Sequence, residues 1–430
     1  MSDQKPLPDP TRTVAAGSPT LPEAIDRQPV NAEALADLHS LYAAEPPIND
    51  YRGAARDFGF QDVNGLATPQ TVPRVGERAS FFTADGNRPA ELVYQDDLAA
   101  YWVESGLEID QDALANAAGK FRERYYPLLA QTLGEVLKAA QNGTPPLTIL
   151  HLLAGPESDE LGYFTERDQF PRSLFSDSNE RDMVYLNMGE LGPEDPLYIG
   201  TLLHEVQHVI QWKLDGNEER WLNEGLSQVL ETIAGLNTVD PASYLERTHF
   251  RLDSWSDDET NSTALYGGSY LYLLYFWEQL GNDALAELAR SPANGLSAVR
   301  AVLSGYRPNM TLEQFTADWA TALYLDGVSP ERRFTIEHQE LSRPFFANRV
   351  RQLPFETVSS MEQFSVDYID LDFSGPATLS FSGDSSVELL DPPANGEPFW
   401  YALPSNSARS QLTAVIDLSD LPRAELSFFA

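Results

Sequence analysis

The segment TLLHEVQHVIQWKLDGNEERWLNEGLSQ, from Thr201 to Gln228, decides the fold of the centre of this chain. Its apolar residues recur at helical spacing on both sides of the turn "LDGN", where Gly216 is expected to end a helix. We expect that helix to span Pro196–Leu214. Its predicted buried face consists of Leu202, Leu203, Val206, Val209 and Ile210.

A metal-binding pattern lies on another face of the same helix. His204 and His208 are four residues apart, so their imidazoles project one turn apart and can ligate one ion. Glu205 follows the first histidine and can face the same cleft without reaching the metal. The pattern therefore predicts a metal site with Glu205 as a catalytic base.

Glu224 is the expected third ligand. His208 and Glu224 are each eight residues from Gly216, which places both about 12 Å from the turn of an antiparallel helical hairpin. Two histidines and one carboxylate leave a fourth tetrahedral position for water, which is typical of one catalytic Zn²⁺ ion. The alternative is that these residues form an ordinary solvated helix face.

The predicted chemistry is hydrolysis of an amide. Zinc lowers the pKa of bound water toward about 7 and polarises the carbonyl. Glu205 would accept the proton of the attacking water and pass it to the leaving nitrogen. Since His204 and His208 bind metal only when neutral, activity should fall below about pH 5–6.

Composition excludes several other classes of protein. The 430 residues contain no cysteine, which removes disulfides, thiolate catalysis and Cys-ligated metals. A net charge of −36 disfavours nucleic acid as a partner, and no apolar run reaches the length of a transmembrane segment. Calcium binding is conceivable for so acidic a chain but unsupported, because no DxDxDG loop is present. Residues 1–25 show no signal peptide.

The fold class expected from the pattern is α+β. A Pro-rich leader precedes strand-like alternation from about Thr71 to Trp102, and Ile109–Ala140 is expected to be a long helix. Compact apolar strands are predicted at Pro146–Leu153 and Asp182–Met188, and helices from Glu218 to about Tyr324. The predicted parts are 1–48 (extended leader), 49–214 (N-terminal half of a peptidase domain), 215–350 (its helical half) and 351–430 (a β-rich module).

The chain resembles the hyicolysin-like neutral zinc metallopeptidases, which are glutamate-type zincins with a thermolysin-like catalytic core. The resemblance is carried by "HEVQH" and "WLNEGLSQ", by Gly162–Met188, by "YGGSYLYLLYFWEQLG" (Tyr266–Gly281) and by "SPANGLSAV" (Ser291–Val299). It spans about residues 75–330. It implies zinc on His204, His208 and Glu224 with Glu205 as base, and an exported protein, secreted or at the cell surface, that acts as an endopeptidase on proteins or peptides.

Two features depart from thermolysin. The position four residues after Glu224, where thermolysin has an aspartate that supports a histidine, is Gln228 here, so Glu231 is the expected substitute. The spacing from His208 to Glu224 is also shorter. Tyr266 and Tyr270 are the candidate oxyanion donors, with His249 as a third; the alternative is that the tyrosines belong to a buried aromatic stripe.

Substrate binding is expected at an edge strand of Gly162–Thr165, which includes Tyr163 and Phe164. The alternative is a turn with buried aromatic residues. His151 and His338 are interpreted as structural. The β-rich module resembles the start of the jelly-roll domain that follows the catalytic domain in peptidases such as immune inhibitor A, and it is either small or truncated.

Two rival functions stay open at this stage. The first is a metal-binding but proteolytically silent adhesion or binding protein, and the intact Glu205 argues against it. The second is a zinc hydrolase that acts on a non-peptide amide or ester. The sequence does not indicate cleavage specificity or oligomeric state.

Overall fold

The sheet of this protein is mixed and is built from six strands. The computed structural model describes residues 51–383 except 58, 61–71, 140–141, 156–159, 238 and 256–258. The strands are β1 (Arg78–Thr83), β2 (Gly86–Gln95), β3 (Ala99–Glu104), β4 (Leu147–Leu152), β5 (Gly162–Tyr163) and β6 (Met183–Asn187). Their order across the sheet is β1-β2-β3-β4-β6-β5. The predicted α+β class is confirmed.

The type of strand pairing changes twice across the sheet. β1, β2 and β3 form an antiparallel meander, β3, β4 and β6 are parallel, and β5 returns antiparallel to β6. Strand β4 is buried along its whole length, as expected for a central parallel strand. The short β5 therefore forms one edge of the sheet, beside the helix that carries the two histidines.

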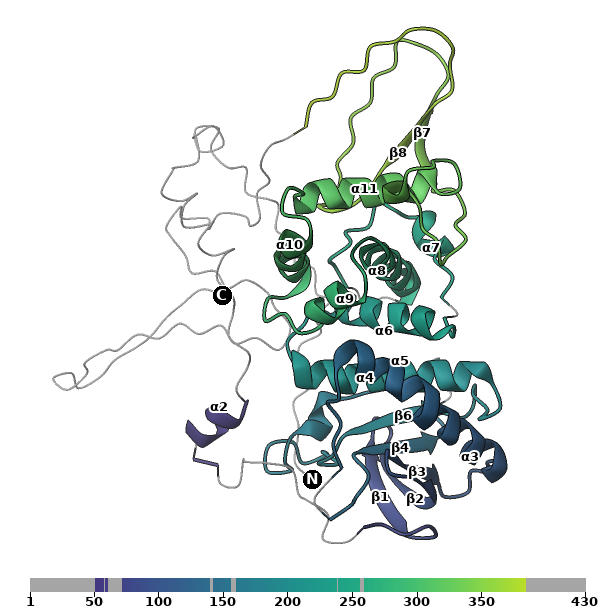
Figure 1. Cartoon of the computed structure of the whole chain (residues 1–430), viewed down its shortest axis with the longest axis vertical. Coiled ribbons are helices and arrows are strands. Elements are labelled where there is room, and N and C mark those ends of the chain that lie inside the picture. Colours follow the sequence, from purple (N-terminus) through teal and green to yellow (C-terminus); the bar gives the residue numbers. More distant parts are fainter. Residues whose placement is uncertain are drawn as a thin grey trace, which may run out of the picture. The chain divides into compact units, whose positions relative to one another are not determined.

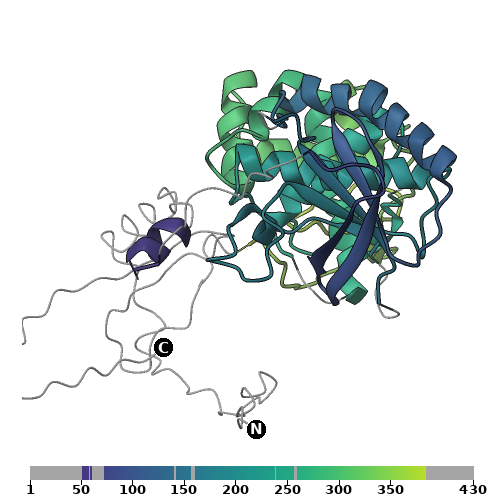
Figure 2. The same cartoon turned by 90° about the horizontal axis from the view of Figure 1, so that it is seen from below.

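Helices α3, α4 and α5 (Pro196–Leu214) lie beside the sheet (Figure 1), and the view from below shows the strands in front of them (Figure 2). The predicted long helix 109–140 is present as one continuous stretch but is wrong in its limits, since it spans residues 111–133. It consists of α3 (Gln111–Lys120), a π turn (Phe121–Tyr125) and α4 (Tyr126–Leu133). Pro127 has no N–H for the helical ladder, which accounts for the irregular turn before it, and Gly134 ends α4 at φ 92°.

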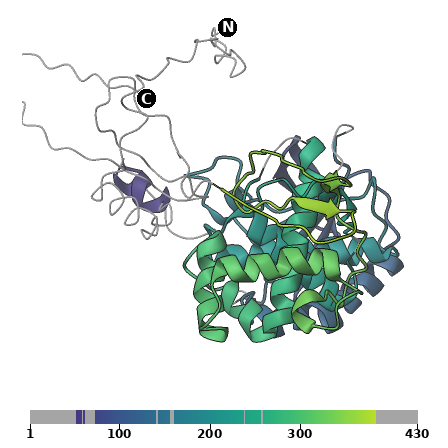
Figure 3. The same cartoon turned by 90° about the horizontal axis from the view of Figure 1, so that it is seen from above.

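The segment from Glu218 to about Tyr324 is mostly helical, as predicted. Its helices are α6 (Arg220–Ala234), α7 (Ala242–Leu245), α8 (Glu259–Leu280), α9 (Asn282–Leu288), α10 (Gly295–Tyr306) and α11 (Leu312–Leu325). Helix α8 is surrounded by α6, α7 and α11 (Figure 1), which explains why Tyr270–Phe276 are all buried. Figure 3 shows the helical half from above. Within the described residues, no helix combines the length and apolarity needed to cross a bilayer.

The described part of the C-terminal module contains little regular structure. β7 (Phe346–Val350), which directly precedes the predicted module, and β8 (Tyr368–Leu371), which lies within it, form a parallel pair. The segment 376–382, which alternation predicts as a strand, forms none. The remaining predicted strands of the module, like the leader 1–48, lie outside the described residues.

Two histidines are structural, as predicted. His151 on β4 is fully buried, and its ring nitrogens lie 2.8 Å from the Trp102 carbonyl and 2.8 Å from the Tyr198 hydroxyl. Burial lowers the pKa of His151 to about 4, so the ring stays neutral and joins the sheet to α5. His338 is hydrogen-bonded to the Glu278 carboxylate at 2.9 Å.

Candidate metal centre

Helix α5 (Pro196–Leu214) has the predicted limits and presents both histidines to α6. Asp195 caps its first turn by accepting a hydrogen bond from the Leu197 amide at 2.9 Å, and Pro196 stands at its first position. The five apolar residues of the predicted stripe, Leu202, Leu203, Val206, Val209 and Ile210, are fully buried. This packing fixes the rotation of α5 and thus the direction of the histidines.

The three predicted ligands converge on one point. Glu224 Oε2 lies 3.2 Å from His204 Nε2 and 3.6 Å from His208 Nε2. One ligand atom from each residue lies within 4.8 Å of the others. We call these three residues the His–Glu group. The turn 215–219 therefore positions the helices as the residue count predicted.

The donor set of the His–Glu group fits a metal ion. Ligand atoms at about 2.0–2.2 Å from a tetrahedral ion lie about 3–4 Å from one another, and the distances from Glu224 Oε2 to the two histidine nitrogens, 3.2 and 3.6 Å, fall in this range. Two imidazole nitrogens and one carboxylate oxygen are donors that zinc accepts readily. The group is only slightly exposed, so a bound ion would be held against few competing waters. These residues could hold a metal ion.

Each histidine is oriented through its other ring nitrogen. Glu231 Oε1 lies 2.6 Å from His204 Nδ1, and Asn223 Oδ1 lies 3.1 Å from His208 Nδ1. Glu231 thus occupies the supporting position that the sequence suggested for it, while Gln228 is buried nearby on α6. Such partners fix the tautomer and raise the basicity of the ligating nitrogen. The sequence analysis missed Asn223, although its position directly before Glu224 was a usable signal.

Glu231→Gln should weaken zinc binding by about 10–100-fold, because the amide cannot supply the charge that supports His204. Competition titration against a chromophoric chelator measures this affinity. Glu246→Gln, an exposed carboxylate at the end of α7, is the matched control and should bind zinc as the wild type does. Equal affinities for wild type and Glu231→Gln would remove the supporting role of Glu231.

The electrostatics of the group favour positive charge. Burial lowers the pKa of His204, but hydrogen bonds to Glu224 and Glu231 outweigh it and hold that pKa well above the usual value. Burial raises the pKa of Glu224, and the nearby histidines reverse this and hold it far below its ordinary range. A divalent cation would neutralise the same carboxylates, so protons on the histidines and a metal ion compete for this site.

Glu205 is buried beside the group. Its carboxylate is desolvated, and this raises its pKa despite the opposing effect of His204 and His208. A raised pKa suits a base that must take a proton near neutral pH and release it again. A Cβ on Gly162 would come within 3.1 Å of Glu205 Cγ and 2.9 Å of the Tyr185 carbonyl. Glycine at 162 therefore lets the edge strand lie directly against the base.

The edge strand is shorter than predicted. β5 contains Gly162 and Tyr163 only, instead of Gly162–Thr165, because Thr165 caps a 3₁₀ turn (Glu166–Gln169). The Tyr163 ring stacks on Tyr185 with centroids 4.2 Å apart. Phe164 is partly buried against the core. The strand thus lies beside the site, while its aromatic side chains pack as the alternative reading expected.

The two candidate tyrosines differ in their surroundings. Tyr266 is hydrogen-bonded to Arg220, and the charges of Glu224 and Glu205 act on it. Burial raises its pKa, so its hydroxyl stays protonated and can donate. Arg220 itself lies 3.5 Å, Nε to Oε1, from Glu224. Sequence reasoning missed Arg220, although it is four residues before Glu224 on the same helix face.

Tyr270 belongs to the buried aromatic stripe. It is fully buried, and its hydroxyl donates to Gln339 and accepts from Thr232 at 3.0 Å. These contacts occupy the Tyr270 hydroxyl, so it is not available to donate a hydrogen bond to an oxyanion. His249 is exposed and its ring packs on the adjacent Phe250, at 4.8 Å between centroids.

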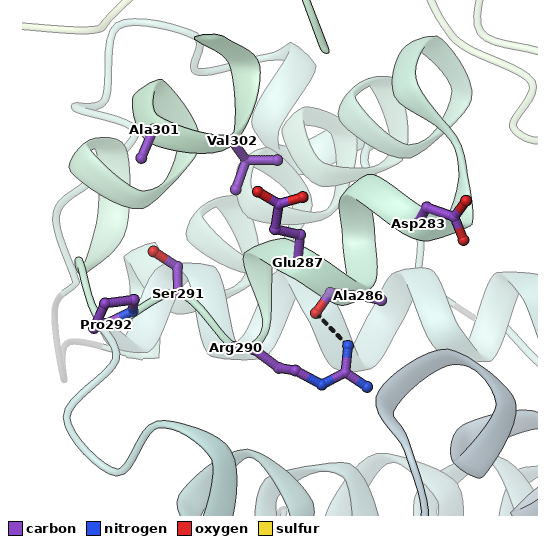
Figure 4. Close-up of a pocket in the computed structure, with 8 residues that line it drawn as sticks. All are labelled: Asp283, Ala286, Glu287, Arg290, Ser291, Pro292, Ala301 and Val302. Atoms are coloured by element: carbon purple, nitrogen blue, oxygen red, sulfur yellow. Dashed lines mark hydrogen bonds between the residues drawn. The ribbon is translucent and has the colours of Figure 1, made fainter. Parts of the chain in front are cut away.

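A separate pocket of about 540 Å³ lies between α9 and α10 and has no connection with this chemistry. Figure 4 shows its lining, in which Arg290 donates to the Ala286 carbonyl. Neither a histidine nor any member of the His–Glu group lines it. The buried metal centre, rather than this open pocket, is the candidate active site.

Comparison with known proteins adds no family assignment. No protein-family model and no curated protein sequence matches the chain.

Proposed function

We propose that this protein is a zinc-dependent endopeptidase. One observation carries the proposal: His204, His208 and Glu224 converge within ligand distance, with the buried carboxylate of Glu205 next to them. A purely structural site would be closed by a fourth protein ligand, whereas three ligands beside a buried base are typical of hydrolytic zinc sites.

The residues of the chain have distinct roles in this proposal. Zinc, when bound by the His–Glu group, would supply Lewis acidity and activate a water for attack. Glu205 accepts the proton of the attacking water and delivers it to the leaving nitrogen. Glu231 and Asn223 keep His204 and His208 in the ligating orientation. The edge strand β5 aligns an extended peptide against Glu205.

Tyr266 donates a hydrogen bond to the oxygen on which negative charge develops in the transition state. Tyr266→Phe should therefore lower kcat by about 100-fold and change KM little, because the lost bond forms mainly in the transition state. Steady-state kinetics on a quenched peptide provide both constants. Tyr270→Phe is the matched control on the same helix, since it loses a hydroxyl bound to Thr232 instead. Equal losses in both variants would assign Tyr266 a packing role.

The wider assignment rests on the resemblance of the active-site segments. We propose that residues 49–350 are a thermolysin-like zincin domain of the hyicolysin-like type, followed by a jelly-roll-like module. The proposal includes export, to the medium or the cell surface. The rivals are a silent metal-binding protein and a zinc hydrolase of a non-peptide amide or ester.

Metal removal tests the proposal directly. We expect casein or a quenched peptide library to be cleaved, cleavage to stop after treatment with dipicolinic acid, and stoichiometric zinc to restore it. Tight zinc binding without cleavage of any peptide would support one of the two rivals. Cleavage that survives complete removal of zinc would exclude the proposed function.

A further inference from the structure

The turn between α5 and α6 contains buried oxygens that have no hydrogen-bond partner. Asp215, Asn217 and Glu218 are exposed by only 5%, 2% and 6%. Asp215 Oδ2, Asn217 Oδ1 and Glu218 Oε2 each lack a partner among the described residues. Unpaired buried acceptors are costly, and three within four consecutive residues call for a ligand.

These oxygens are held in place by their neighbours. Glu218 Oε1 accepts hydrogen bonds from the amides of Gly295 at 2.7 Å and Glu219 at 2.6 Å, which leaves Oε2 as the free oxygen of an oriented carboxylate. The Asn217 carbonyl accepts a hydrogen bond from the Asn294 side chain at 3.0 Å. The turn is thus fastened to the start of α10, and its side chains are fixed.

No basic side chain is among the groups that act on the carboxylates of Asp215 and Glu218. The charged residues that act on Glu218 are Asp215 and Glu219, both acidic. Burial raises the pKa of Glu218 to about 8 and that of Asp215 to about 6, which reflects the cost of keeping two carboxylates here. Two buried carboxylates and one amide oxygen together require a cation or a proton.

We propose that the turn 215–219 binds a structural Ca²⁺ ion through the side-chain oxygens of Asp215, Asn217 and Glu218. Ligands that are all oxygen select a hard cation, and two carboxylates balance the charge of a divalent one. Calcium fits better than magnesium, because calcium accepts irregular sets of carboxylate and amide oxygens, whereas magnesium demands a near-ideal octahedron. This site is separate from the His–Glu group and does not rest on the proposed peptidase activity.

An ion bound in this turn would influence the His–Glu group, because the turn connects the two helices that carry it. Asp215 follows the last residue of α5, and Glu219 precedes the first residue of α6. The helices on either side carry His204, His208 and Glu224. An ion at the turn would fix the two helices relative to each other and so stabilise the metal centre without taking part in it.

Terbium luminescence tests the site in the full-length, zinc-loaded protein, in which zinc blocks the His–Glu group. Trp212 lies against the turn, because a Cβ on Gly216 would come within 3.4 Å of its ring, so it can sensitise bound Tb³⁺. We expect Trp-sensitised emission that Ca²⁺ competes away and Mg²⁺ does not. Ca²⁺ in excess should also raise Tm by roughly 5 °C.

Two variants locate the ion. Asp215→Asn and Glu218→Gln should each weaken Tb³⁺ and Ca²⁺ binding at least tenfold, whereas the exposed Glu246→Gln should bind both normally. If both turn variants fail to fold, the wild-type titration still decides. A wild type whose Tm and emission ignore Ca²⁺ would overturn the proposal in favour of a protonated Glu218. So would a calcium response that is retained in both variants.

Discussion

Glu205→Gln is expected to lower kcat for peptide cleavage by about 10³-fold or more while zinc still binds with wild-type affinity. Glu205 is buried beside the ligands and no ligand role falls to it, so the substitution removes the proton acceptor and keeps the site. The glutamine has nearly the same shape, so the contact with Gly162 should survive.

The measurement combines peptide kinetics with zinc titration of the same protein sample. Glu190→Gln, an exposed carboxylate after β6, is the control and should cleave normally. Wild-type cleavage by the zinc-loaded Glu205→Gln variant would disprove the proposed mechanism. Loss of both zinc binding and activity would show that Glu205 supports the structure of the site and not the proton transfer.

Glu224→Gln is expected to weaken zinc binding by more than about 100-fold, a larger loss than Glu231→Gln should cause, because it removes a ligand rather than a supporting group. The change also removes the negative charge of the carboxylate whose Oε2 lies 3.2 Å from His204 Nε2. Activity should be lost in proportion to zinc occupancy. Gln228→Ala, one turn further along α6, is a control that should retain zinc.

The affinity of the wild type for zinc should itself depend on pH. The pKa of His204 is raised well above its usual value, so a proton competes with zinc there even near neutral pH. Zinc affinity should therefore fall as pH decreases, and activity with it. Zinc titrations from neutral pH down to about pH 5 measure this. An affinity independent of pH in that range would contradict ligation by His204.

The local pattern was sufficient to predict the helices of the site. Apolar residues at helical spacing, Asp195 and Pro196 at one end and the turn at Gly216 gave Pro196–Leu214 with correct limits. Counting residues across the turn predicted that Glu224 would meet His208, since a hairpin with a short connection leaves little freedom in register. The predicted helix 109–140 was too long, because Gly134 at φ 92° ends α4 after Leu133.

Local patterns were enough to predict the α+β class, the two helices of the site and the convergence of the His–Glu group, because these depend on periodicity and on the spacing across one short turn. The contacts around these residues follow from the tertiary structure. It paired Asn223 with His208 and Tyr266 with Arg220, engaged Tyr270 elsewhere, and left three acceptors without partners in the turn 215–219. Such contacts depend on packing between segments far apart in the chain, and the periodicity of the sequence carries no information about that packing.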